Sequence, residues 1–309
     1  MPPDIRPPDI RPPEARSPAP SASVLTLVRG RAGCLRNLMR GLARQSAPPG
    51  ELVIAWMQPE LPPSLPDPGC PVRHLHVPGE PMPLAAARNR AAEAAAGDLL
   101  IFLDVDCIPA AGLVAAYAAA ASGAEGLFLG EVLYLPPEAG RDLDDVRLDD
   151  PALDRLGRPH PARPPVPETG LRREPDPGQL WGLSFALHAR AWRSVGGMDE
   201  DFTGYGGEET DFAARLAATG LPTYWAAGAR AYHQHHPVHV PPLQHFAPIL
   251  ANAARFRARH GRWCMTYWLG QFRAAGLIDW TDDAPAIRLI RPPTAPEIAA
   301  ALRPGDLFS

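Results

Sequence analysis

The stretch GDLLIFLDVDCIPA, residues 97–110, places two carboxylates at the end of a continuous apolar run. If the strand extends through Asp106, then Asp104 and Asp106 share one face while Val105 points into the core, because alternate strand residues face opposite sides. Two neighbouring carboxylates repel each other unless a cation lies between them. Mg²⁺ and Mn²⁺ take oxygen ligands, often carboxylates together with substrate phosphates. The pattern predicts a metal–diphosphate site, although a D-x-D sequence alone also occurs by chance.

A second acidic cluster, GYGGEETD, occupies residues 204–211. Its glycines allow a ligand or a neighbouring segment to approach the backbone closely, and they permit unusual φ angles. Its acidic residues begin a predicted helix. Glu208, Glu209 and Asp211 either complement the dipole of that helix or present a general base to a substrate hydroxyl. The residues alone leave both interpretations open.

Four histidines follow in YHQHHPVH, residues 232–239. If a strand continues through them, His233 and His235 share one face and His236 lies on the other. Imidazole nitrogen is a ligand that suits Mn and Zn. We therefore expect one of these histidines to bind a metal, although a single histidine in such a place is more often structural.

Two arginines, Arg88 and Arg90, lie in a predicted helix just before the strand that leads to Asp104. One interpretation is a solvated helix face. The other is a guanidinium that reaches a nucleotide or diphosphate, for which its fork of N–H donors is suited.

The elements that must position these side chains alternate between strands and helices. Continuous apolar strands alternating with helices predict a parallel sheet covered on both faces. In such sheets ligands bind beyond the carboxyl ends of the strands, where Asp104 and Asp106 lie. We expect strands at 23–30, 51–56, 72–77, 98–106, 127–136, 183–188 and within 221–236, and helices at 35–45, 83–97, 112–122, 208–219 and 243–260.

The chain divides into three predicted segments. Residues 1–22 form a Pro-rich tail with a repeated PPDIR unit, expected to be disordered because proline at this density forbids helix and ladder. Residues 23–240 form one α/β domain, with a flexible loop at about 137–178 where no periodicity persists. Residues 241–309 form a helical, aromatic C-terminal extension.

Composition restricts the partners and the compartment. The chain has 309 residues, a net charge of −4 and scattered basic residues, all of them arginine, so we expect no nucleic-acid partner. Its four cysteines are far apart in sequence, which favours reduced thiols over a disulfide framework. We expect neither a signal peptide nor a transmembrane segment. The interpretation is a cytoplasmic protein, compatible with peripheral contact at the inner face of a membrane.

Taken in order, these segments resemble a GT-A fold glycosyltransferase of family 2, over about residues 24–236. The resemblance is carried by VLTLVRGRAGCLRNLMRGLARQ, by AAARNRAAEAAAGDLLIFLDVDCIP and, most specifically, by GGMDEDFTGYGGEETDFAARL. The last is similar to the acidic motif shared by family 2 enzymes and the C-terminal half of β-1,4-galactosyltransferases. The resemblance implies an α/β fold with a Rossmann-like, mostly parallel central sheet flanked by helices.

The resemblance also implies an activity and a set of site residues. The activity is inverting transfer of a hexose from a nucleotide sugar, above all a UDP-sugar, to a hydroxyl of a glycan, lipid-linked or small-molecule acceptor, with Mn²⁺ or Mg²⁺. The catalytic base is Glu209, with Glu208 beside it. The implied nucleotide-binding residues are Thr26, Arg29, Gln58, Arg88 and Asp104. The implied sugar- and acceptor-binding residues are Trp181, Gly182, Tyr205, Gly207 and Asp211. The implied metal ligands are Asp106 and His233, with Asp104 and His235 as further candidates.

Two departures from the family pattern leave alternatives open. The usual Glu-Asp pair is Glu208-Glu209 here, so the base could be either glutamate. The strand at 51–56 continues to Gln58, where many relatives place an acidic pair for uracil. Two rival functions use the same residues: a metal-dependent nucleotide-sugar hydrolase, and a catalytically silent protein that binds sugar nucleotides.

Overall fold

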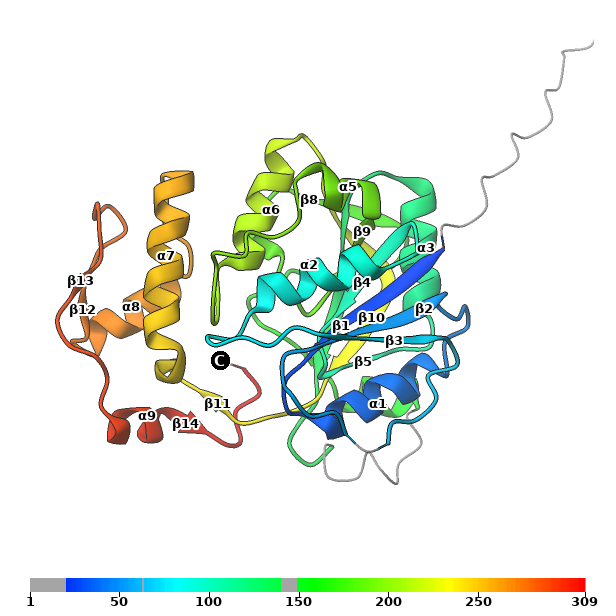
Figure 1. Ribbon diagram of the computed structural model, residues 1–309, viewed down its shortest axis with the longest axis horizontal. Helices are drawn as coiled ribbons and strands as arrows, with labels where there is room; N and C mark the ends of the chain where they lie inside the picture. The colour runs from blue at the N-terminus through cyan, green and yellow to red at the C-terminus, as the bar shows by residue number, and fades with distance from the viewer. Residues whose placement is uncertain (1–20, 63, 140–148, 309) are drawn as a thin grey trace, which may run out of the picture.

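A computed structural model describes residues 21–62, 64–139 and 149–308 of the chain. Most of the predicted Pro-rich tail and the middle of the predicted loop lie outside these residues. Figure 1 shows a twisted sheet with helices on both faces and, beside it, a smaller lobe formed by the C-terminal segment. None of the helices in the described ranges is both long enough and apolar enough to cross a membrane.

Six strands of the central sheet run in one direction, with β9 reversed between β4 and β6. The order along the sheet is β3-β2-β1-β4-β9-β6-β10-β5, in which the short strand β5 (Cys107–Pro109) is antiparallel to β10. The strands are β1 (Ala22–Val28), β2 (Glu51–Trp56), β3 (Val72–His76), β4 (Leu99–Leu103), β6 (Leu127–Tyr134), β9 (Ser184–His188) and β10 (Thr223–His233). This confirms the predicted mostly parallel sheet, and the carboxyl ends of β1, β4, β6 and β10 meet at one edge.

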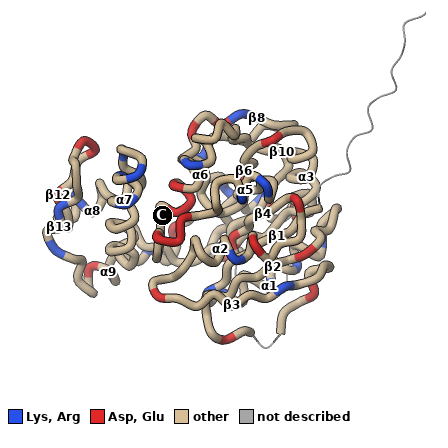
Figure 2. Tube along the Cα trace, turned by 45° about the horizontal axis from the view of Figure 1, so that its top comes forward, with Lys and Arg blue, Asp and Glu red and all other residues tan. Residues whose placement is uncertain are grey.

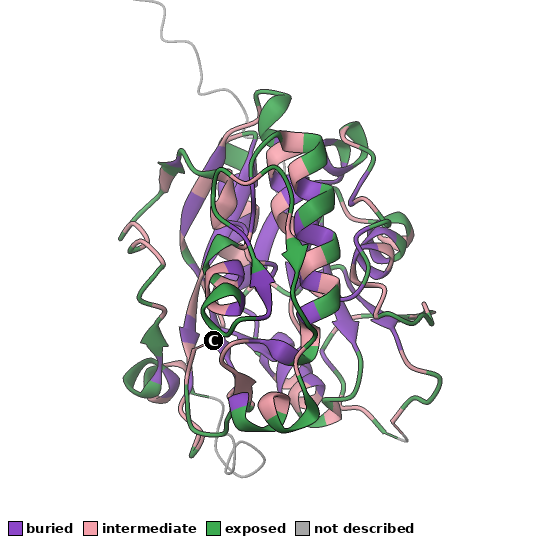
Figure 3. Cartoon of the chain, turned by 90° about the vertical axis from the view of Figure 1, so that its left-hand side faces the viewer, coloured by how far each residue is buried: buried purple, intermediate pink, exposed green. Residues whose placement is uncertain are grey.

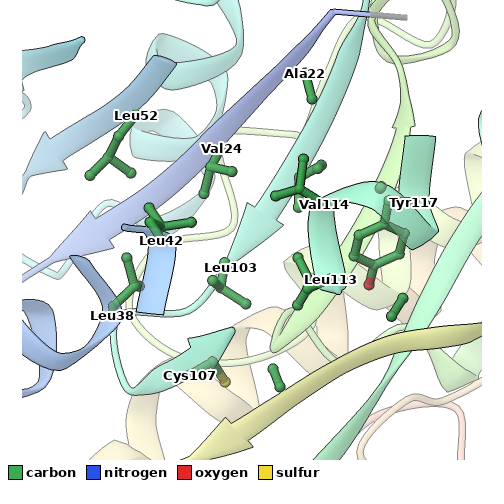
Figure 4. Packing of buried hydrophobic residues seen from close by; sticks show 14 of the residues in the cluster. Ala22, Val24, Leu38, Leu42, Leu52, Leu103, Cys107, Leu113, Val114 and Tyr117 are labelled. Atoms are coloured by element: carbon green, nitrogen blue, oxygen red, sulfur yellow. The ribbon is translucent and has the colours of Figure 1, made fainter. Parts of the chain in front are cut away.

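Helices cover both faces of the sheet because neighbouring strand residues point to opposite sides. Val24 and Val28 pack with helices α1 (Ala32–Leu42) and α3 (Leu113–Gly123), and Figure 4 shows part of this core. Leu25 and Leu27 belong to the opposite core, under α2 (Leu84–Ala94), α5 (Ala189–Ser194) and α6 (Glu208–Ala218).

The predicted loop at about 137–178 contains short elements where the structure describes it. These are helix α4 (Asp150–Leu156), strands β7 (Arg158–Pro159) and β8 (Leu171–Glu174), and the 3₁₀ turn η1 (Pro177–Gln179). β7 pairs with β6 and β8 with β10, both antiparallel. Strands of two and four residues are too short to show a period of two, so the sequence pattern did not reveal them.

The C-terminal segment forms a small lobe with its own apolar core, which includes Phe256, Leu269 and Phe272 and packs against Phe202 of the α/β domain. Figure 3 looks onto this lobe from the side away from the sheet, and exposed positions lie on the surface of its helices that is turned to the viewer. Its elements are β11 (Val238–His239), η2 (Leu243–His245), α7 (Phe246–His260), α8 (Thr266–Ala274), β12 (Ile278–Asp279), β13 (Arg288–Leu289), α9 (Ala295–Ala301) and β14 (Leu302–Arg303). β14 pairs with β11, which brings the end of the chain back to the sheet.

Candidate active site

A carboxylate and two imidazoles converge at the carboxyl edge of the sheet. Asp106 lies in the turn between β4 and the short strand β5 (Cys107–Pro109), and β5 pairs with β10 so that Cys107 lies opposite His233. His233 Nε2 and His236 Nε2 each lie 3.5 Å from a carboxylate oxygen of Asp106. One ligand atom from each of the three residues lies within 4.8 Å of the others. The group therefore has the size and donor types of a metal site.

The structure arranges the histidines differently from the strand alternation expected for them. Strand β10 ends at His233, so the alternation that pairs His233 with His235 does not continue. His236 joins Asp106 instead, while Nε2 of His235 is buried without a hydrogen-bond partner among the described residues. Pro237 has no backbone N–H to donate to a neighbouring strand, and this was the available signal that the strand pattern should stop here.

The two aspartates also lie in a turn and not in a strand, because β4 ends at Leu103. Val105 is buried as predicted, at 3% exposure. Burial raises the pKa of both Asp104 and Asp106. The Asp106 carboxylate raises the pKa of Asp104 further, whereas Arg31 lowers the pKa of Asp106 and offsets part of the effect of burial. The Asp104 N–H donates to the carbonyl of Leu183 at 2.9 Å, which ties this turn to the segment before β9.

The donor set of this group fits a divalent ion such as Mn²⁺. Burial lowers the pKa of His233 to about 3, so its imidazole is neutral and keeps a lone pair for coordination. Asp106, at 1% exposure, offers carboxylate oxygens. The guanidinium of Arg31 contacts the Asp106 carboxylate, and Arg31 itself has a left-handed backbone with φ 54°. Arg31 was not singled out from the sequence, where it is one of several arginines near the first helix.

A second group of charges lies at the start of α6. Arg88 from α2, with a side chain 6% exposed, donates to Glu209 Oε1 at 2.6 Å and to Glu208 Oε1 at 3.2 Å. Glu208 Oε2 is buried without a partner among the described residues. Burial and the neighbouring Glu208 raise the pKa of Glu209 to about 8, although its side chain keeps 20% exposure. The structure thus places Arg88 on the two glutamates, and its contact with a nucleotide stays a prediction.

The backbone around Glu209 leaves no room for extra side chains. Gly182 has φ +59°, and a Cβ there would overlap the Glu209 carboxylate and press on Arg88. Gly207, with φ +92°, directly precedes α6, and a Cβ there would lie 3.2 Å from the ring of Phe202. These two glycines are required by close approach and by backbone conformation.

The aromatic residues predicted for the sugar site, Trp181 and Tyr205, lie near Glu209. Trp181 precedes Gly182 and meets the ring of His160 edge-on at 4.9 Å. Tyr205 stacks on His245 at 4.5 Å, and burial together with Glu209 and Glu208 raises its pKa. Both aromatic side chains are partly buried, so they retain surface for a ligand.

The predicted nucleotide-binding residues are spread along the same edge. Thr26 lies within β1 at 1% exposure, and its hydroxyl has no partner among the described residues. Arg29 is ion-paired with Glu80 at the surface. Gln58 accepts a hydrogen bond from the Gly30 N–H, which joins the loop after β1 to the end of β2.

Asp211 does not face the sugar site as predicted, because cations from two helices occupy it. The carboxylate is fully buried and accepts from Arg215 Nε and Arg259 Nη1, both at 2.7 Å, and lies 2.9 Å from His260 Nε2. Together these bonds lower its pKa. Asp211 therefore attaches helix α7 to helix α6, and in Figure 2 acidic positions gather between α6 and the C-terminal lobe.

Asn252 of α7 is a positioning residue that the sequence did not reveal. Its Nδ2 donates to the carbonyl of Gly206 at 2.7 Å and to that of Thr203 at 3.1 Å. The amide thus holds the glycine loop from which Glu208 and Glu209 begin. A contact between residues so far apart in the chain has no local sequence signal.

Comparisons with known proteins address the fold. A family model described as the N-terminal domain of galactosyltransferase matches residues 174–237. Among solved structures, GalNAc-T7 with UDP, GalNAc and Mn²⁺ superposes with a TM-score of 0.51 at 17% identity, over 70% of this chain and 43% of that one. TarS 1-349 of S. aureus superposes with a TM-score of 0.51 at 11% identity, over 82% and 72%. The chain has the GT-A fold of glycosyltransferases.

Within this GT-A fold, residues 174–237 contain Gly182, both glutamates of α6, and His233. Validoxylamine A glucosyltransferase of Streptomyces hygroscopicus subsp. jinggangensis is 49% identical over 43 residues, which is 14% of this chain and 10% of that protein. The chain therefore matches only about a tenth of the length of this curated relative and less than half of GalNAc-T7.

Proposed function

We propose that this chain is an inverting hexosyltransferase, similar to family 2, that moves a sugar from a UDP-sugar to an acceptor hydroxyl with a divalent metal. One observation carries the proposal: a carboxylate–imidazole group and a glutamate pair lie at the same edge of a GT-A sheet. GalNAc-T7, which has the same fold, was solved with UDP, GalNAc and Mn²⁺, and this supports the proposed combination of ligands.

Asp106, His233 and His236 would hold the ion, with Asp104 next to the nucleotide. A bound divalent ion stabilises negative charge on a leaving diphosphate. Thr26, Arg29 and Gln58 would line the nucleotide end of the site.

Glu209 is the proposed base, since it is the more exposed of the two glutamates and lies against Gly182. It takes a proton from the acceptor hydroxyl as the oxygen attacks the anomeric carbon. Arg88 fixes both glutamates, and the raised pKa of Glu209 suits proton transfer near neutral pH. Trp181 and Tyr205 would pack against sugar rings near this carboxylate.

The test is product analysis with a panel of UDP-sugars, Mn²⁺ and mixed acceptors, with the anomeric configuration read by NMR. Inversion at the anomeric carbon, with a loss of about 10²–10⁴-fold in Glu209→Gln, is the expected result. Release of free sugar at the same rate with and without acceptors would favour a nucleotide-sugar hydrolase. Binding of UDP without any turnover would favour a silent sugar-nucleotide-binding protein.

A further inference from the structure

A cavity of about 380 Å³ lies beside the segment that precedes β9. Its walls include Tyr134, His160, Arg163, Leu183 and Trp225. The cavity is therefore built mainly from the loop after β7 and from the ends of β6 and β10, and none of the site residues predicted from the sequence lines it.

Arg163 is the cationic side chain of this cavity, and aromatic rings hold it in place. Its guanidinium carbon lies 4.4 Å from the ring centroid of Trp181 and 4.6 Å from that of Trp225. One N–H group donates to the carbonyl of Gln179. A guanidinium has five N–H donors at its edge, so the stacked indoles leave donors available for a planar anion.

No carboxylate among the described residues forms an ion pair with Arg163. The two nearby candidates are engaged elsewhere: Glu131 accepts from Arg230 Nε at 2.6 Å, and Glu174 accepts from Trp225 Nε1 at 2.8 Å. Burial lowers the pKa of Arg163 to about 10. A largely buried cation that finds no counter-charge within residues 21–62, 64–139 and 149–308 is costly, and an anionic ligand would offset that cost.

The cavity adjoins the proposed base through one short segment. Trp181 lies against Arg163, Gly182 packs on Glu209, and Leu183 lines the cavity. A sugar whose reacting atom lies at Glu209 can therefore extend a substituent toward Arg163.

We propose that Arg163 binds the carboxylate or phosphate of an acidic sugar, so that one of the two substrates carries an acidic group on its sugar in addition to any nucleotide diphosphate. This proposal rests on the proposed glycosyltransferase function, because it assumes that a sugar occupies the space beside Glu209. The anion is carried either by the sugar of the donor or by the acceptor.

The test compares acidic and neutral partners by calorimetric titration of the wild-type full chain. Glucuronic acid and glucose 6-phosphate against glucose probe the acceptor side, and UDP-glucuronic acid against UDP-glucose with Mn²⁺ probes the donor side. We expect at least about tenfold tighter binding of the acidic partner in one of the two comparisons, as for a charge-assisted bidentate contact. Arg163→Gln abolishes the preference, whereas Arg190→Gln, at an exposed arginine paired with Glu125, retains it.

Equal binding of acidic and neutral partners on both sides, while UDP and Mn²⁺ still bind, refutes the role of Arg163 and leaves the proposed function standing. Preference for the acid without any binding of UDP supports the anion site and refutes the proposed function. If Arg163→Gln does not fold, the wild-type comparison still tests the proposal, because equal binding of acidic and neutral partners refutes it without any variant.

Discussion

Replacing Glu209 by Gln tests whether the glutamate pair holds a proton at neutral pH. The cluster combines one buried guanidinium, Arg88, with two carboxylates, Glu208 and Glu209. The negative charge is therefore in excess in a site that water barely reaches. Burial, together with the negative charge of Glu208, raises the pKa of Glu209 from 4.5 to about 8.

The sign of the stability effect follows from this direction. Between about pH 4.5 and pH 8 the folded state keeps a proton that the unfolded state releases, so the free energy of unfolding falls as pH rises. If the folded state holds one full proton that the unfolded state has released, the free energy of unfolding falls by about 1.4 kcal/mol per pH unit. This slope is an upper limit because the Glu209 side chain is 20% exposed. Glu209→Gln cannot titrate, so its stability relative to wild type increases across the same window.

The assay is urea unfolding of metal-free wild type and Glu209→Gln from pH 5 to pH 9. All other titrating groups are common to both proteins, so the difference between the two curves isolates Glu209. The kcat/KM of wild type rises about tenfold between pH 7 and pH 9. With a pKa of about 8, only about a tenth of Glu209 is ionised at pH 7, and only the ionised form acts as the base. Glu208→Gln is the matched variant: it removes one repelling charge and shifts the rise in activity toward lower pH.

Parallel stability curves for wild type and Glu209→Gln from pH 5 to pH 8 would refute this reasoning. They would mean that the carboxylate is ionised throughout and that Arg88 fully compensates it.

Three further substitutions test how the site is held. Asn252→Ala removes both hydrogen bonds to the glycine loop and lowers kcat by roughly tenfold, with UDP affinity in calorimetry unchanged; an equal loss of UDP affinity would contradict a role confined to the base. Gly182→Ala destabilises the protein by about 1–3 kcal/mol in urea unfolding and abolishes turnover, whereas Gly270→Ala in open space within α8 does neither. His236→Ala weakens Mn²⁺ binding by more than about tenfold in calorimetry, and His235→Ala does not; the reverse order would restore the ligand set expected from strand alternation.

The fold was largely predictable because its central strands β1, β2 and β4 are buried on both faces. The runs at 99–103 and 52–56 are continuously apolar, and the structure places both of them in fully buried strands. The reversed direction of β9 was not predictable, since its five residues, SFALH, carry no information about the partner strand. The pairing of β8 with β10 was missed for a similar reason.

The candidate site was predictable where its residues lie at the end of a strand or directly after one. Asp106 follows β4 and His233 ends β10, two parallel strands whose carboxyl ends lie at the same edge of the sheet, and the antiparallel pairing of β5 with β10 brings the two residues together. Contacts made by tertiary packing were not predictable. Arg88 reaches glutamates 120 residues away, and Asp211 is paired with cations from a helix of the C-terminal lobe. His236 was missed because strand alternation was extended past the end of β10.

The most direct test of the account is the thermal stability of wild type and Asp106→Ala with UDP, with Mn²⁺ and with both together. A ligand that binds the folded state raises the melting temperature by mass action. The account predicts a rise with UDP and Mn²⁺ together that exceeds either alone and disappears in Asp106→Ala. An unchanged melting temperature in wild type with UDP and Mn²⁺, or an equal rise in both proteins, would contradict a metal–nucleotide site at this edge of the sheet.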